Sequence, residues 1–270
     1  MSRNFRSWPI LLALRLASAP LVLMYVYLVV DTVTDTAPGA LLPQRFTLEH
    51  WRFLWQDMPS RPSIWLVTLN TLIFATVTSA IVLVVSSLAG YALSRLNVPG
   101  RGGLLAGTIV LHAFPSVTLL IAIFLILQLV GLYNTLGGVI LVKTALELPF
   151  GIWIMKGFND TVPWEIEMAG IVDGASRAQI FRRVVLPQVR PALLALGIFS
   201  FLAGWSEFIL APGQSVQMLS VYLASLIQDD SNFDMNLFKA VGVFYAIPVI
   251  LMFVFFQNRL LAMYGGGTKG

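Results

Sequence analysis

The stretch Asn159–Pro191, NDTVPWEIEMAGIVDGASRAQIFRRVVLPQVRP, is a long polar segment between apolar runs, and it carries signals of ordered structure. Its first part, Trp164–Val172, is expected to form a short helix. Asp160 or Thr161 can cap that helix, because their side-chain oxygens accept hydrogen bonds from the first free N–H groups. Pro163 suits the first turn, where its missing N–H is not needed. The segment is therefore predicted to begin with a helix.

A second helix is predicted directly after the first. Asp173-Gly174 is a turn signal that ends the first helix, and Ser176 followed three residues later by Gln179 forms a capping box. Leu186-Pro187 is expected to stop the second helix, because proline excludes the residue before it from helical geometry. The apolar residues of this helix share one face: Ile180, Phe181, Val184 and Val185. The stretch thus predicts a helix–turn–helix hairpin.

Small residues gather near the turn, at Ala169, Gly170, Gly174 and Ala175. Side chains of this size let another backbone come close. Two interpretations are open on this basis. The hairpin is either a docking element for a soluble partner protein, or an amphipathic element on the inner leaflet whose arginines pair with lipid phosphates.

The composition is that of a membrane protein. Hydrophobic residues make up 57% of the 270 residues and charged residues only 11%, whereas about a quarter of a soluble domain is charged. The chain has no cysteine, which excludes disulfides, thiolate zinc sites and a cysteine nucleophile. Its net charge of +4 is better explained by basic loops on one side of a membrane than by nucleic-acid binding.

Six apolar runs predict an all-α membrane protein that forms one domain over residues 1–270. The predicted spans are 8–30, 63–93, 104–130, 137–155, 192–210 and 239–261. The hairpin then lies in the loop 156–191, between spans four and five. The loop after the first span holds a possible interfacial helix at Thr47–Trp55. The loop 211–236 carries Asp229, Asp230 and Asp234, but the EF-hand pattern is absent, so solvated acids are expected there.

Several polar residues fall inside predicted spans. Lys143 and Glu147 are four apart on one helical face, so they are either a simple ion pair or part of a transport pathway. Glu207 also needs a partner, which the sequence does not identify. Four further residues are either solute contacts or ordinary capping and interface residues: Asn70, Gln128, Trp205 and Tyr245. His112 has no second ligand at metal-binding spacing.

The basic residues indicate the orientation. With six spans both ends lie on one side, together with Arg3, Arg6, Arg95, Arg101, Lys156, Arg177, Arg182, Arg183, Arg190, Arg259 and Lys269. Fewer lie on or near the other side: Arg45, Arg52, Arg61 and Lys239. The positive-inside rule therefore predicts that both termini and the hairpin are cytoplasmic.

Four motifs resemble those of permease subunits of bacterial ABC importers, in the carbohydrate-type (MalG-like) branch of binding-protein-dependent sugar transporters. Gly174, nine residues and then Val184-x-Leu186-Pro187 resemble the second half of the EAA loop, and Asp173-Gly174-Ala175 resembles the DGA of that branch. The other signals are Tyr91–Arg95 (YALSR), Trp205–Phe208 (WSEF) and the C-terminal tail ending in Lys-Gly. The resemblance runs from about residue 47 to the end.

The resemblance implies that the hairpin is a coupling helix seated in a cleft of an ATPase subunit. The implied docking residues are Glu165, Glu167, Met168, Ala169, Gly170, Asp173, Gly174, Ala175, Arg177, Leu186 and Pro187. A second contact with the ATPase is implied for the tail residues Gly267, Thr268, Lys269 and Gly270. The chain departs from the pattern at Met168, which stands where the motif has glutamate, while Glu167 matches a second acidic position.

The resemblance further implies two ATPase subunits that bind ATP and Mg²⁺, a second and different permease, and an extracytoplasmic solute-binding protein. The setting would be the inner membrane of a bacterium or archaeon. This chain itself has no P-loop, no metal cluster and no catalytic constellation, so it is expected to be a transport subunit rather than an enzyme. The alternative is a stand-alone secondary transporter or channel, but only Lys143, Glu147 and Glu207 could serve an ion relay.

Overall fold

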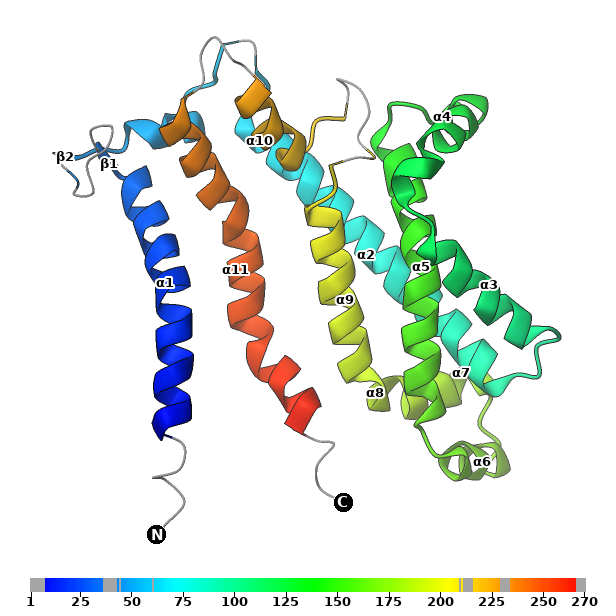
Figure 1. The fold of residues 1–270 in the computed structure, drawn as a ribbon. Coiled ribbons are helices and arrows are strands. Elements are labelled where there is room, and N and C mark those ends of the chain that lie inside the picture. The colour runs from blue at the N-terminus through cyan, green and yellow to red at the C-terminus, as the bar shows by residue number, and fades with distance from the viewer. Residues whose placement is uncertain are drawn as a thin grey trace. The chain divides into compact units, whose positions relative to one another are not determined.

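The computed structural model describes residues 8–35, 43, 45–59, 61–208, 210, 216–228 and 234–265, which are mostly helical (Figure 1). The chain falls into two compact units. One unit is Met1–Trp65 with Tyr222–Pro248, and the other is Leu66–Val221 with Val249–Gly270.

The first unit contains one long N-terminal helix and short elements after it: α1 (Trp8–Thr32), the antiparallel strands β1 (Thr34–Asp35) and β2 (Arg45–Phe46), η1 (Glu49–Leu54), and the start of α11 (Met235–Gly265). The end of α1 is tied to α11 by an ion pair between Asp31 and Lys239 at 2.5 Å. The short helix predicted at Thr47–Trp55 is present as the 3-10 helix η1.

The second unit is built around three long helices: α2 (Ile64–Arg95), α5 (Leu136–Asp160) and α9 (Arg190–Trp205). Glycines let these helices approach closely. A Cβ on Gly151 of α5 would lie 2.3 Å from Ser86 Oγ of α2, and one on Gly204 of α9 would lie 2.9 Å from the Ala75 backbone of α2. The absence of a side chain at these two glycines therefore allows α5 and α9 to pack closely on α2, and a larger side chain would prevent it.

Four helices among the described residues are long and apolar enough to cross a membrane: α1, α2, α5 and the part of α11 from Met235 to Gln257. They cover four of the six predicted spans. A fifth is reached if Arg177–Gln188 and Arg190–Trp205, which are bent by 76° at the break between them, count as one span.

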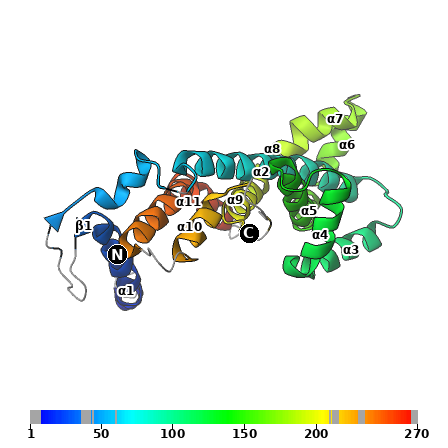
Figure 2. The same cartoon turned by 90° about the horizontal axis from the view of Figure 1, so that it is seen from above.

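The third predicted span, 104–130, is not one helix. It is divided into α3 (Arg101–Ala113), the 3-10 helix η2 (Ser116–Leu119) and α4 (Leu120–Leu129). The break falls at Phe114-Pro115, where Pro115 has an extended backbone, because proline lacks the N–H and disfavours helical geometry in the preceding residue. With 13 residues in α3 and 10 in α4, each piece is shorter than the roughly 20 residues that a span needs. Both views place α3 beside α5 (Figure 1, Figure 2).

Pro187 does not stop its helix, contrary to the prediction. After α7 (Arg177–Ile180) the chain forms a π-helical turn, η3 (Phe181–Val185), and continues as α8 (Leu186–Gln188). A proline ring clashes with the carbonyl four residues earlier in an α-helix, and a π turn changes that spacing. The break instead falls at Val189, so that α9 begins at Arg190 and ends at Trp205, earlier than the predicted limit of 210.

The loop predicted for 211–236 is wrong over Leu219–Gln228, which forms the helix α10. This helix has no charged residue, and it buries Leu219, Tyr222 and Leu226 on one face. The acids that suggested a solvated loop follow the helix. Of these, Asp229 and Asp230 lie outside the described residues.

Candidate functional site

The predicted hairpin begins with α6 (Trp164–Val172). The residue that precedes this helix is Pro163 and no side chain caps it, so the prediction that Asp160 or Thr161 caps α6 is wrong. Both side chains are used at the end of α5 instead. Asp160 accepts from Ser94 at 2.6 Å, and the Thr161 hydroxyl donates to the Phe158 carbonyl at 2.8 Å.

The turn and the start of the second helix are as the sequence predicts. Gly174 has a φ of +81°, a conformation that side chains with a Cβ disfavour. Ser176 and Gln179 make both hydrogen bonds of the capping box. The apolar face of the following helix is buried at Ile180, Phe181 and Val185. We call the segment Trp164–Gln188 the hairpin.

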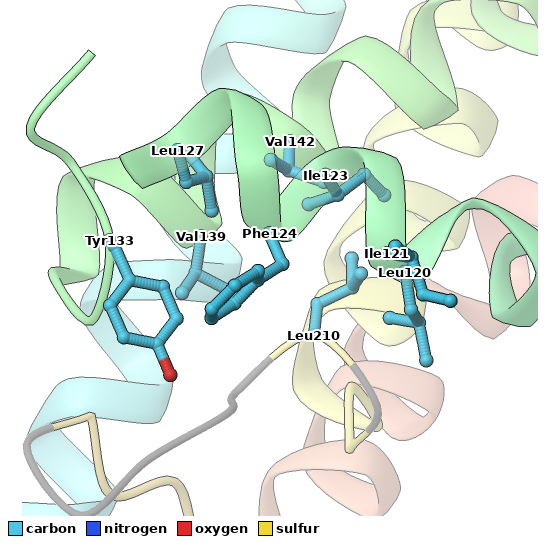
Figure 3. Close-up of a pocket in the computed structure, with 9 residues that line it drawn as sticks. All are labelled: Leu120, Ile121, Ile123, Phe124, Leu127, Tyr133, Val139, Val142 and Leu210. Carbon is cyan, nitrogen blue, oxygen red and sulfur yellow. The ribbon is translucent and has the colours of Figure 1, made fainter. Parts of the chain in front are cut away.

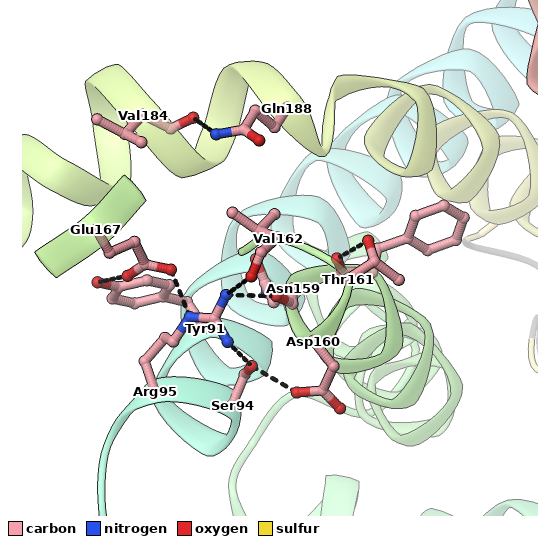
Figure 4. A network of polar contacts seen from close by, with 11 residues as sticks. Tyr91, Ser94, Arg95, Asn159, Asp160, Thr161, Val162, Glu167, Val184 and Gln188 are labelled. Carbon is pink, nitrogen blue, oxygen red and sulfur yellow. Dashed lines mark hydrogen bonds and ion pairs between the residues drawn. The ribbon is translucent and has the colours of Figure 1, made fainter. Parts of the chain in front are cut away.

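Arg95, the last residue of α2, connects three elements (Figure 4). Its Nε forms a buried ion pair with Glu167 of α6. Its Nη2 donates to the carbonyls of Asn159 at 2.8 Å and Val162 at 2.6 Å. The Tyr91 hydroxyl donates to the other oxygen of Glu167 at 3.2 Å. The side chains of one turn of α2 therefore hold the end of α5 and the hairpin together.

The burial of Glu167 decides which way α6 faces. Glu167 is 0% exposed and the side chain of Arg95 is 7% exposed, so the Glu167 carboxylate points into the protein. The other predicted docking residues are at least partly accessible. Glu165, Ala169, Asp173, Gly174 and Arg177 are exposed, and Met168, Gly170, Ala175, Leu186 and Pro187 are half-buried.

The outer surface of the hairpin also carries apolar residues that the sequence analysis missed as site candidates. Val172 is 85% exposed, and Trp164 and Ile166 of the same helix are exposed as well. No sequence signal separates them from buried residues, because Trp164–Val172 also carries apolar residues on the side that faces the protein. Exposed apolar side chains rimmed by polar ones are typical of a surface that binds another protein.

A second group of polar residues lies within the predicted spans. Lys143 of α5 forms ion pairs with Glu147 at 3.2 Å and with Glu207 at 2.9 Å. Lys143 is therefore the partner of Glu207 that the sequence does not identify. The second Glu207 oxygen accepts from the Leu210 N–H at 3.0 Å.

This group lines a cavity of about 320 Å³ that also includes His112 and Phe114. Of the six predicted pathway residues, only Glu147 and Glu207 line it. Asn70 donates to the carbonyl of Gln217, in the segment before α10, at 3.2 Å. Trp205 is buried in the core at 1% exposed, whereas Gln128 is exposed and Tyr245 is half-buried.

A neighbouring cavity of about 280 Å³ is almost entirely apolar (Figure 3). Its residues come from α4, α5 and the segments after α4 and α9. Phe124 and Tyr133 make an edge-to-face contact with 4.9 Å between the ring centroids. Leu210 lines both cavities. The polar cavity is thus bordered on one side by an apolar wall.

No group of three metal-ligating side chains occurs within the described part of the chain. The tail residues Gly267, Thr268, Lys269 and Gly270, which the resemblance assigned to an ATPase contact, lie outside the described residues.

The described residues thus combine long apolar helices with a hairpin that is fixed to the ends of two of them. Residues 82–261 match the family described as binding-protein-dependent transport system inner membrane component, and the chain belongs to this family. It is therefore the membrane-spanning permease subunit of an ABC importer, and ATP hydrolysis belongs to a separate subunit. Membership of this family favours the importer over a stand-alone transporter or channel.

Curated relatives include sugar permeases. The chain is 28% identical over 277 residues to the trehalose transport system permease protein SugB of Mycobacterium tuberculosis, with 100% of this chain and 99% of the relative covered. It is 31% identical over 255 residues to the maltose/maltodextrin transport system permease protein MalG of Salmonella typhimurium, covering 87% and 85%. The predicted resemblance to the sugar branch is confirmed by these matches.

A similar fold occurs in the crystal structure of a bacterial ABC transporter involved in the import of the acidic polysaccharide alginate. That chain aligns with a TM-score of 0.76 at 24% identity, over 96% of this chain and 98% of that one. The likeness supports the fold assignment.

Proposed function

We propose that this chain forms part of the translocation pathway for a sugar or a related polar solute, and that the hairpin is where an ATPase subunit docks. The observation that carries the proposal is the two-sided construction of the hairpin. One side is bound to α2 and α5 through Glu167 and Arg95, and the other presents Val172, Asp173 and Arg177 at the surface.

This construction suits a part that transmits force. A hairpin held only by loops would move without moving the spans, whereas the buried ion pair and the apolar face bind it rigidly to them. ATP-driven closure of the ATPases would push the outer side, and the spans would change between inward-open and outward-open states. Arg95 and Tyr91 are positioning residues in this scheme, because they act through Glu167 and not on the partner.

The complete importer would contain two ATPase subunits with ATP and Mg²⁺, a second and different permease, and an extracytoplasmic solute-binding protein. The names of the sugar-permease relatives support the solute class, and another solved structure with a similar fold is an alginate transporter in complex with a pentasaccharide-bound periplasmic protein. We place six spans in the bacterial or archaeal inner membrane, with both termini and the hairpin in the cytoplasm, because most basic loop residues fall on that side.

Photo-crosslinking from the hairpin tests the docking surface. Val172, which is 85% exposed, is replaced by p-benzoylphenylalanine in the native host, and adducts are identified by mass spectrometry. We expect an adduct with an ATPase subunit. The matched control is Phe46, which is 81% exposed on β2 and should not form that adduct. Adducts with lipid alone at both positions would instead indicate that the hairpin lies on the membrane surface.

A further inference from the structure

The polar cavity holds more carboxyl groups than amino groups. Glu147, Lys143 and Glu207 contribute two carboxyl groups and one amino group, and their side chains are at most 18% exposed. Their formal charges, with histidine counted as neutral, sum to one negative charge. Ionisable residues in spans are rare, and they often mark substrate or ion pathways.

Several hydrogen-bond donors and acceptors of the cavity are not engaged by other described residues. Lys143 has three N–H donors, and among the described residues its partners are the two carboxylates. Glu147 binds Lys143 through Oε1, and its Oε2 has no hydrogen-bond partner within the described ranges. A ligand can therefore find both a donor and an anionic acceptor here.

His112 adds a second acceptor. Its Nδ1 lies 3.3 Å from the Leu146 carbonyl, which can only accept, so this contact assigns the proton of the neutral ring to Nδ1. Nε2 is then an acceptor, and no described residue donates to it. The ring stacks on Phe150 at 5.5 Å between centroids, which fixes its plane at the edge of the cavity.

The cavity also has apolar side chains in its wall that can contact the C–H groups of a sugar ring. Phe114 and Leu119 line it beside the polar groups, and its volume of about 320 Å³ lies in the range of small-molecule sites. A pyranose ring presents hydroxyl groups around its edge and C–H groups on its faces. Donors and acceptors set between an aromatic ring and aliphatic side chains complement both parts.

We propose that this cavity is a solute subsite that binds one uncharged, hydroxyl-rich sugar ring and disfavours an anionic one. The inference rests on the proposed function, and it adds the location of a solute contact and the charge class of the solute. An anionic sugar would bring a second negative charge next to Glu147, whereas the hydroxyls of a neutral sugar can donate to Glu147 and His112.

Equilibrium dialysis of the purified importer without its binding protein tests the subsite. The probes are labelled trehalose and maltose as neutral sugars and digalacturonate as an anionic one. We expect the wild type to bind at least one neutral probe and to exclude digalacturonate. Glu147→Gln should weaken neutral binding about tenfold, because a charge-assisted hydrogen bond is lost, and should raise digalacturonate binding relative to the neutral sugar. Glu147→Asp should restore the wild-type preference.

The control is Glu49→Gln, the same chemical change on the exposed helix η1, and it should alter neither value. Two results would overturn the subsite: a wild type that binds none of the neutral probes, or a Glu147→Gln importer with the affinity and charge preference of the control. Thermal unfolding of each assembly identifies a variant that fails to fold. ATP-driven uptake by wild-type proteoliposomes with the binding protein tests the proposed function separately, because the importer can move a neutral sugar even if Glu147 does not contact it.

Discussion

Arg95 and Glu167 are 72 residues apart in the sequence and form an ion pair whose two side chains are almost completely buried. The pair joins the last residue of α2 to the middle of α6. Because the Arg95 guanidinium also binds the carbonyl of Asn159 in the last turn of α5 and that of Val162 just after it, the hairpin has a fixed position on the ends of two long helices.

Breaking this pair should destabilise the importer. Glu167→Gln leaves the guanidinium of Arg95 buried without its counter-ion, and the loss of one partner of a buried pair costs about 3 kcal/mol. The expected result is a lower unfolding temperature of the purified importer, together with ATP hydrolysis that no longer drives uptake. In a cycle of Arg95→Met, Glu167→Met and the double variant, the double variant should lose less stability than the sum of the two single methionine variants, and strict additivity would contradict a direct interaction.

The glycine turn of the hairpin should tolerate no bulky residue. A Cβ on Gly174 would meet no atom within 4 Å, so a tryptophan there projects outward into the space that a docked ATPase would occupy. Gly174→Trp is expected to uncouple ATP hydrolysis from uptake without unfolding the chain. Gly100→Trp is the matched control, because Gly100 has a similar φ of +71° and equally open surroundings. Normal uptake by Gly174→Trp proteoliposomes would argue against docking at this turn.

Close packing of α5 on α2 predicts opposite effects for two glycines of the same helix. Gly151→Ala places a methyl group 2.3 Å from Ser86 Oγ, and overpacking of this kind costs about 1–3 kcal/mol. Gly157→Ala meets no atom within 4 Å and should stabilise the helix by up to about 1 kcal/mol. Unfolding temperatures of the two purified variants measure the difference, and equal values would mean that α2 and α5 are not in contact at Gly151.

The absence of native cysteine allows a direct test of the orientation. Single cysteines are introduced at Asp173 in the hairpin and at Phe46 in the loop after the first span. A membrane-impermeant maleimide should label Phe46→Cys in intact cells or right-side-out vesicles, and Asp173→Cys only after permeabilisation. Labelling of Asp173→Cys from outside would reverse the proposed orientation and remove the hairpin from the reach of a cytoplasmic ATPase.

The sequence predicts the hairpin well because its signals are local. Asp173-Gly174 and the Ser176–Gln179 capping box each act within a few residues, and both are present in the structure. The same is true of the Lys143–Glu147 pair, whose members are one helical turn apart. Local spacing fixes these contacts without knowledge of the rest of the chain.

The parts that were missed depend on distant or competing effects. Neither Arg95 as partner of Glu167 nor Lys143 as partner of Glu207 follows from spacing, since the two members of each pair are more than 60 residues apart in the sequence. The break at Pro115 does not follow from hydropathy, because the apolar run continues across it and hydropathy takes no account of backbone geometry. At Pro187 the sequence predicts an end that the structure lacks, because a π turn lets the helix continue where a proline usually ends it.

The short connection between the hairpin and α9 has a mechanical consequence. Only Val189 separates α8 from a helix of 16 residues, about 24 Å long, and Glu207 follows two residues after that helix ends. A stiff rod therefore runs from the hairpin to the polar cavity. A tilt of α9 at the hairpin end would displace the Glu207 carboxylate that binds Lys143 at the other end. The movement driven by the ATPase and the change at the solute cavity would then occur through the same helix.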